Sequence, residues 1–249
     1  MIGIIARREA QALFRAPLAW VVLAATQVIV SWQFLALLDI FMEEQPRLRT
    51  LANPPGITQA VCLPSFGVTA LVMLLLAPLL TMHSLSGERR SGALKLYLSA
   101  PVSATEIVLG KFIGLLSLAA VIWILNLLMA ATLAWGTVLD YGTLAAALLG
   151  LALLMMATLA VGLFCSSLTA QPALAATGTF GILLLVWMVD WQSGRGTTSG
   201  LLAYLSMPDH FQRLSQGLLD TADIDYFLLL TTTALALAIW RLDGDRRAF

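Results

Sequence analysis

Long apolar runs alternate with short polar segments along the whole chain. A helix needs about 20 mostly apolar residues to cross the roughly 30 Å of hydrocarbon in a bilayer. Runs of that length, or close to it, cover residues 17–40, 64–82, 112–135, 144–168, 172–191 and 224–242. The pattern therefore predicts an all-α polytopic membrane protein with six transmembrane helices, folded as a single domain over residues 1–249.

Two polar segments outside the central part of the chain predict amphipathic structure. Residues 1–16 place apolar side chains on one helical face and Arg7, Arg8 and Arg15 on the other. This pattern is typical of an interfacial helix lying along the inner leaflet, and a plain lead-in that only sets topology is the alternative. Residues 191–223 include an amphipathic stretch that is too short and too polar to span, which predicts a re-entrant or interfacial hairpin at the outer face.

The polar segment at residues 83–111 separates the second and third apolar runs. Its composition favours a helix over residues 87–98, which ends before Pro101 because the residue preceding a proline resists the helical region. Ser103 and Glu106 then have the spacing of a capping box, so a second helix is expected to begin there and continue into the third run. A helix lying across the cytoplasmic surface would transmit motion between two spans, and an ordinary solvated loop is the alternative.

Composition supports the membrane assignment, and the basic residues indicate the orientation. The chain is 59% hydrophobic and 11% charged, whereas soluble domains are about 25% charged. Its net charge of zero gives no sign of a nucleic-acid partner. The segments on the side of the two termini hold ten of the fourteen Lys and Arg residues: Arg7, Arg8, Arg15, Arg89, Arg90, Lys95, Lys111, Arg241, Arg246 and Arg247. By the positive-inside rule, both termini are expected to be cytoplasmic.

Two amides and a glycine pair stand out within the apolar runs. Gln33 lies in the first run and Asn126 in the third. An amide in hydrocarbon is unfavourable unless it is hydrogen-bonded, so both are expected to face other helices, and a position lining a transport pathway is the alternative. Gly110 and Gly114 form a G-x-x-x-G pattern, which allows close helix packing within one subunit or between two.

Residues that could carry catalysis or bind a metal are sparse in this sequence. Residues 105–111 lack the leading glycine of a phosphate-binding loop and are followed by Phe112 instead of Ser or Thr, so we expect no ATP hydrolysis by that route. His210 has no second His or Cys nearby with which to hold a metal. Cys62 and Cys165 are predicted at opposite faces of the bilayer, too far apart for a disulfide. We therefore expect no catalytic residue and no metal site, and the runs also lack the buried carboxylates of ion-coupled carriers.

The segment at residues 83–111 resembles the central loop of ABC-2 type exporter permeases. In that family an acidic-basic-glycine segment leads into a short coupling helix, then a Ser-Pro turn, then a Gly-Lys pair at the next span. Here GERRSG at 87–92, LYLSAPVS at 96–103 and EIVLGK at 106–111 supply that pattern, while Ala93 stands where the family more often has Thr. The resemblance implies contact with an ATPase at Glu88, Arg89, Arg90, Ser91, Gly92, Leu96, Leu98, Ser99 and Pro101. It also implies a second, smaller cytoplasmic contact at Ser166, Ser167, Thr169 and Gln171.

The outer segment resembles a narrower branch of that family, the gliding-associated (GldF-type) permeases, which are close to the NosY-type permeases. The residues that carry this resemblance are Tyr204, Leu205, Ser206, His210, Phe211, Gly217 and Asp220. The branch implies an auxiliary subunit with a large extracytoplasmic domain. We expect that subunit to contact the outer hairpin at Tyr204, Ser206, His210 and Phe211.

The family resemblance implies a complex in the bacterial cytoplasmic (inner) membrane. It would contain two permease subunits, identical or related, and two cytoplasmic ATPases that hold ATP and Mg²⁺. This chain would then be the permease subunit of an exporter-type complex, binding no cofactor directly and not itself an enzyme. The alternatives are a mechanotransmitting or scaffold subunit that moves no solute, a secondary carrier or channel, and an intramembrane enzyme.

Overall fold

The computed structural model describes residues 1–48, 55–93, 102–188 and 206–247, and every regular element in those ranges is a helix, as the apolar pattern predicts. In chain order these elements are α1 (Ile2–Arg15), α2 (Pro17–Leu48), the π-helical turn η1 (Thr58–Cys62), α3 (Leu63–Thr81), α4 (Ser86–Ser91), α6 (Ala104–Thr132), the 3-10 turn η2 (Leu133–Trp135), α7 (Tyr141–Leu168), α8 (Pro172–Met188), α11 (Met207–Ser215) and α12 (Thr221–Arg247). The predicted fold class is confirmed.

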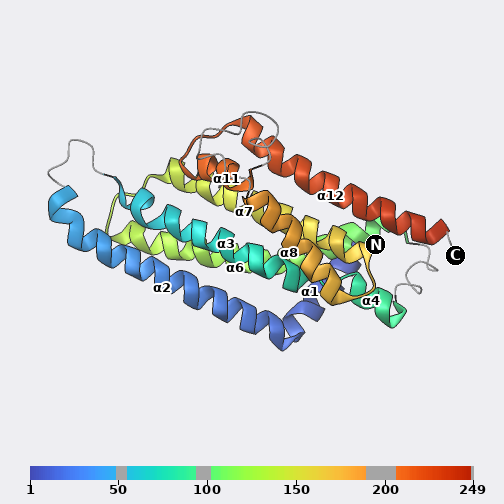
Figure 1. Cartoon of the computed structure of the whole chain (residues 1–249). Helices are drawn as coiled ribbons and strands as arrows, with labels where there is room; N and C mark the ends of the chain where they lie inside the picture. Colours follow the sequence, from blue (N-terminus) through green and yellow to red (C-terminus); the bar gives the residue numbers. More distant parts are fainter. Residues whose placement is uncertain (49–54, 94–101, 189–205, 248–249) are drawn as a thin grey trace.

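The long helices α2, α3, α6, α7, α8 and α12 run side by side in a bundle with both termini at one end (Figure 1). We call this the proximal end, where α1 and α4 also lie, and the opposite end, near η1 and α11, the distal end. Within the described ranges, five helical stretches are long and apolar enough to cross a membrane. The sixth predicted span, at residues 172–191, is the apolar helix α8, which has 17 residues within the described part of the chain.

Helix α7 forms the centre of the bundle and packs against α3, α6, α8, α11 and α12. Its apolar side chains are buried around nearly its whole circumference, which is typical of a helix enclosed by other helices. Small residues allow these close contacts. A Cβ atom added at Gly162 would overlap the side chain of Thr81 on α3, and one added at Gly150 would lie 3.1 Å from Cβ of Leu214 on α11.

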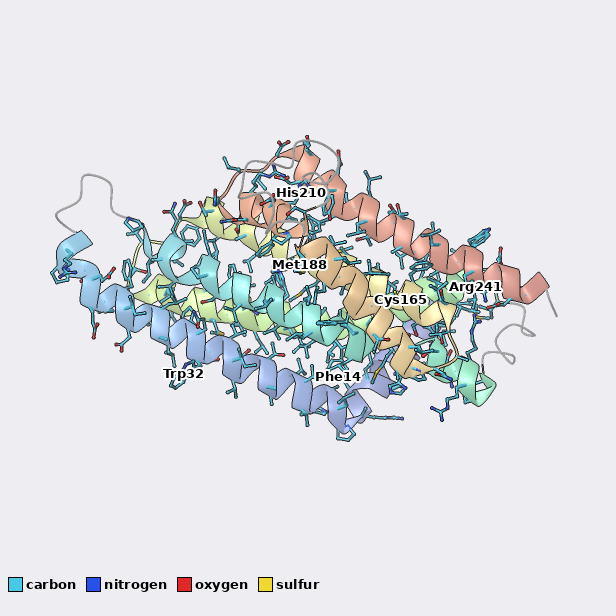
Figure 2. The ribbon with its side chains drawn as sticks, viewed as in Figure 1. Phe14, Trp32, Cys165, Met188, His210 and Arg241 are labelled. Carbon is cyan, nitrogen blue, oxygen red and sulfur yellow. The ribbon has the colours of Figure 1, made fainter. Side chains whose placement is uncertain are left out.

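Helix α2 lies at the edge of the bundle and exposes many large apolar side chains. Trp32, labelled in Figure 2, is 76% exposed, and Trp20, Val28 and Leu35 are also more than half exposed. A continuous apolar surface of this kind is unfavourable in water and marks contact with lipid or with another membrane helix. The exposed face therefore agrees with a helix at the perimeter of a membrane bundle.

The two amides occupy different environments. Asn126 is buried between α6 and α3, where its Oδ1 accepts a hydrogen bond from Oγ1 of Thr69 at 2.9 Å and its Nδ2 donates to the carbonyl of Ile122 at 2.9 Å. Such a pair satisfies the amide inside the bundle, as expected of a helix interface. Gln33 is half-buried on α2. Cys62 and Cys165 are free, buried thiols.

Candidate functional site

The first half of the predicted coupling segment is the short helix α4. It ends at Gly92, whose φ of 77° lies in the left-handed region that glycine adopts without steric cost. The expected helix over residues 87–98 is therefore interrupted at Gly92, because a left-handed residue cannot continue a right-handed helix. The predicted contact residues Leu96, Leu98, Ser99 and Pro101 lie outside the described part of the chain.

The start of α4 is held by the end of α7. The backbone N–H groups of Leu85 and Ser86 both donate to Oγ of Ser166, at 3.1 and 3.0 Å. The hydroxyl of Ser166 in turn donates to the carbonyl of Met82 at 3.3 Å, so this one side chain satisfies three backbone groups of the α3–α4 connection. Ser166 is fully buried and thus fixes the position of α4 relative to α7.

A buried lysine connects three elements at the proximal end. Lys111 of α6 is 1% exposed, and its Nζ lies 2.8 Å from Oε1 of Glu88 on α4 and 3.1 Å from Oε2 of Glu9 on α1. Ser84 donates to the other oxygen of Glu9 at 3.0 Å. Burial of a charge is strongly unfavourable unless the charge is paired, so the two carboxylates are what allow Lys111 to lie in this position.

The G-x-x-x-G pattern brings Glu9 to this lysine. Helix α1 lies directly on α6, where a Cβ added at Gly110 would be 2.7 Å from Cβ of Ile5 and one added at Gly114 would be 2.5 Å from Cβ of Glu9. The two glycines therefore provide the close approach that the sequence predicts, and the partner is the amphipathic helix α1. Glu9 of α1 therefore lies against Gly114, which is about one helical turn from Lys111 on α6.

The last turns of α12 contact the chain on both sides of the segment 94–101. Arg89 of α4 forms an ion pair with Asp245, which also pairs with Arg241 at 3.0 Å. Nη1 of Arg246 donates to the carbonyl of Val102 at 3.1 Å, directly before α6. These interactions hold the two ends of that segment against one helix.

Helix α6 begins with the predicted capping box. The hydroxyl of Ser103 accepts a hydrogen bond from the backbone N–H of Glu106 at 3.2 Å, and the Glu106 carboxylate accepts one from the Ser103 N–H at 3.0 Å. The capping box is confirmed, and it fixes the first turn of the helix that carries Lys111.

The predicted contact residues of the proximal end fall into two groups. Arg90 and Ser91 are exposed, whereas Glu88 and Arg89 turn toward the bundle and pair with its side chains. At the predicted second contact, Ser166 and Ser167 are fully buried, Thr169 is half-buried and Gln171 is exposed.

Sequence reasoning treated Glu88, Arg89 and Arg90 as one surface and did not identify Glu9 or Asp245. The sequence held one signal for the role of Glu9, which is that it is a single glutamate among the arginines of an amphipathic helix.

A second polar cluster lies at the distal end and joins α11 to α12. Nδ1 of His210, labelled in Figure 2, lies 2.5 Å from Oδ1 of Asp223, and both side chains are 1% exposed. Arg213 approaches the same oxygen at 3.0 Å. The imidazole stacks on the ring of Tyr226, with ring centroids 4.1 Å apart. Nη2 of Arg213 also lies 2.9 Å from Nδ1 of His210, so the three side chains form one polar cluster.

The remaining predicted residues of the distal end lie around this cluster. Ser206 caps the start of α11 by accepting from the N–H of Asp209 at 3.4 Å, and Phe211 is buried against α7. Tyr204 lies outside the described residues. Across the ranges that the structure describes, no group of three or more His, Cys, Asp or Glu side chains could hold a metal ion. His210 and Asp223 form a buried contact between α11 and α12. The sequence analysis did not predict the role of Asp223.

Comparison with known families agrees with this architecture. The family model described as ABC-2 family transporter protein matches residues 4–243, which is nearly the whole chain. No curated protein matches the sequence, so the gliding-associated branch stays a prediction. The bundle of apolar helices and a family match along nearly the full length of the chain lead to the same assignment. The chain belongs to the ABC-2 family of transporter proteins and is a membrane permease component.

Proposed function

We propose that this chain is the permease subunit of an exporter-type ABC complex and that it receives mechanical work at α4 from a separate cytoplasmic ATPase. The partner would hold ATP and Mg²⁺, because this sequence has no phosphate-binding loop. The proximal end would face the cytoplasm, since the sequence segments on the side of the two termini hold ten of the fourteen Lys and Arg residues. Two permease subunits, identical or related, would share the bacterial cytoplasmic membrane.

The observation that carries this proposal is that α4 is connected to four other helices. Lys111 joins Glu88 to α6 and, through Glu9, to α1. Arg89 pairs with α12, and Ser166 of α7 holds the first backbone groups of α4. A displacement of α4 would break buried ion pairs unless these helices moved with it. An ATPase that pushes on α4 would therefore reorient the bundle instead of bending a loop.

The exposed side of α4 is the face offered to the ATPase. Arg90 and Ser91 point away from the network, and the chain continues from them into residues 94–101, the remainder of the proposed coupling segment. Thr169 and Gln171 would form the smaller second contact. An auxiliary subunit at the distal end, as in the gliding-associated branch, would contact α11.

The test is copurification of the partner. Tagged protein would be extracted from its native membrane in mild detergent, and the retained chains would be identified by mass spectrometry. The variant Arg90→Glu reverses an exposed charge on α4, and Arg7→Glu makes the same change on α1 as the matched control. We expect an ATP-binding chain to copurify with the wild type and with Arg7→Glu, and to be lost with Arg90→Glu.

A cross-linking experiment locates the contact directly. Ser91→Cys would place a reactive thiol on the exposed side of α4, whereas the native thiols at Cys62 and Cys165 are buried. A short bifunctional reagent should then join this chain to the ATP-binding chain, with a yield that changes when a non-hydrolysable nucleotide is added. Retention of the partner by Arg90→Glu together with no cross-link at position 91 would contradict the proposal.

A further inference from the structure

A cavity of about 380 Å³ lies beside the ion-pair network at the proximal end. One wall is polar and is formed by Glu9, His83, Ser84, Glu88 and Lys111. The other wall is apolar and includes Leu13, Leu18, Leu79 and Leu80. The walls come from α1, the start of α2, the end of α3, α4 and α6, which meet at this end of the bundle (Figure 1).

The apolar wall of this cavity opens toward the surface of the bundle. Leu18 is 46% and Leu79 is 42% exposed, on helices whose outer faces are covered with large apolar side chains. Helix α1 is amphipathic, and a helix of this type lies at the boundary between headgroups and acyl chains. This position of α1 would place the cavity at that boundary, with its polar wall at headgroup level and its apolar wall facing the hydrocarbon.

The polar wall has an excess of hydrogen-bond acceptors. Glu9 and Glu88 supply two carboxylates against the single ammonium of Lys111, and that ammonium already contacts both. Oε2 of Glu88 is buried and has no hydrogen-bond partner among the described residues. A buried carboxylate oxygen without a donor is unfavourable, so the site is suited to a ligand that brings N–H groups and positive charge.

The charge around the cavity has both signs. Arg8 acts electrostatically on Glu88 from a position outside the cavity lining. A ligand with an ammonium and a nearby anionic group would match this pattern better than a simple cation would. A zwitterionic phospholipid headgroup has that distribution of charge.

We propose that this cavity binds a phospholipid whose headgroup carries a primary ammonium, as phosphatidylethanolamine does. A rotation of the Glu88 carboxylate brings its buried Oε2 to the cavity, where the ammonium donates to it, and an acyl chain lies along the apolar wall. A choline headgroup carries the same charge but has no N–H group, so it cannot satisfy that oxygen. The bound lipid would fill the junction of α1, α3 and α4 and would stabilise the network around Lys111.

The test compares two lipids that differ only in the headgroup. The purified full-length protein, with any chains that copurify, would be placed in nanodiscs containing ethanolamine and choline phospholipids with identical acyl chains in equal amounts. Native mass spectrometry of the released protein reports which lipid is retained. We expect a preference of about tenfold for the ethanolamine lipid, the size of one hydrogen bond to a charged group.

Two variants and a matched control examine the site. Glu88→Gln removes the charge and should reduce the preference to about equal retention. Ala12 lines the cavity and carries no charge, so Ala12→Phe adds bulk there without removing an ion-pair partner, and it should reduce retention of the ethanolamine lipid to the level of the choline lipid. Ala24→Phe makes the same substitution at an exposed position of α2 outside the cavity and should retain the preference.

Three results would rule out an ethanolamine phospholipid as the occupant of this cavity. The first is equal retention of the two lipids by the wild type, and the second is a preference that persists in Ala12→Phe. The third is a rise in the unfolding temperature with free ethanolamine as large as the rise with the lipid, which would make a soluble amine the ligand. None of these measurements requires the ATPase, so their failure is distinct from failure of the proposed function.

Discussion

The ammonium of Lys111 lies 2.8 Å from Oε1 of Glu88, and this ion pair joins the helix that begins the third span to the short helix α4. With Glu9 as a second partner at 3.1 Å, Lys111 is 1% exposed although its side chain is charged. This arrangement connects α1, α4 and α6 at the proximal end of the bundle through one buried side chain.

Replacing Lys111 should destabilise the protein strongly. Lys111→Met leaves two carboxylates facing each other without a cation, and breaking a buried pair in this way costs about 3–5 kcal/mol. The free energy of unfolding in detergent, measured by denaturant titration, reports the loss. Arg90→Met removes an exposed charge from α4 and serves as the control, with an expected change of about 0.5 kcal/mol or less. Equal losses in the two variants would show that the network contributes nothing.

The contact between α1 and α6 should not tolerate a methyl group. In Gly114→Ala the new Cβ would lie 2.5 Å from Cβ of Glu9 and 3.2 Å from the carbonyl of Ala6, so α1 must move away. Overpacking of this kind costs about 1–3 kcal/mol. Gly178→Ala is the control, because a Cβ there meets nothing within 4 Å. Unfolding temperatures of the two purified variants test this, and an unchanged value for Gly114→Ala would contradict the close approach.

Arg89 and Asp245 should show energetic coupling. Both side chains are about one-fifth exposed, so we expect a coupling energy of about 1 kcal/mol, less than for a fully buried pair. A double-mutant cycle with Arg89→Ala, Asp245→Ala and the double variant measures it from unfolding free energies. Strictly additive losses would mean that α4 and α12 are independent.

The distal helix α11 should loosen when its buried carboxylate is removed. Asp223→Ala leaves His210 and Arg213 without their shared acceptor and should cost about 3 kcal/mol. Hydrogen exchange of the amides of Met207–Ser215 should become faster, because α11 loses its polar connection to α12. Asp225→Ala removes an exposed carboxylate from α12, the helix that also carries Asp223, and should leave the exchange of the α11 amides unchanged. If these amides exchanged as slowly in Asp223→Ala as in the wild type, apolar packing alone would account for the stability of α11.

The cap of α7 should respond to pH. Asp140 accepts hydrogen bonds from Oγ1 of Thr143 at 2.6 Å and from the backbone N–H groups of Thr143 and Gly142, and these hold the pKa of its carboxyl below its usual range. A lowered pKa contributes stability that is present above the ordinary value of about 3.9 and is lost as the pH falls through the lower folded-state value. The Asp140→Asn variant should therefore show a weaker acid dependence of its unfolding temperature between about pH 5 and pH 2. An identical dependence in wild type and variant would exclude this cap as the cause.

The sequence alone determined the features that depend on local interactions. A membrane-spanning helix satisfies its backbone hydrogen bonds within itself, so the apolar runs were enough to predict the bundle and its approximate spans. The capping box at Ser103 and Glu106 and the amphipathic helix α1 depend on residues within one or two turns, and both were predicted. The glycine pair at Gly110 and Gly114 indicated a close contact but did not identify its partner.

Which distant residues meet depends on how the helices pack in three dimensions. Lys111 appeared in the sequence as one of several basic residues near a span, and its burial follows from the approach of Glu9 and Glu88 from two other helices. The pairs Arg89–Asp245 and His210–Asp223 likewise join separate elements. Spanning helices that are apolar on every side carry little information about which face meets which neighbour, because lipid and protein interior are similarly apolar. The packing of small residues and the pairing of the few buried charges decide that arrangement.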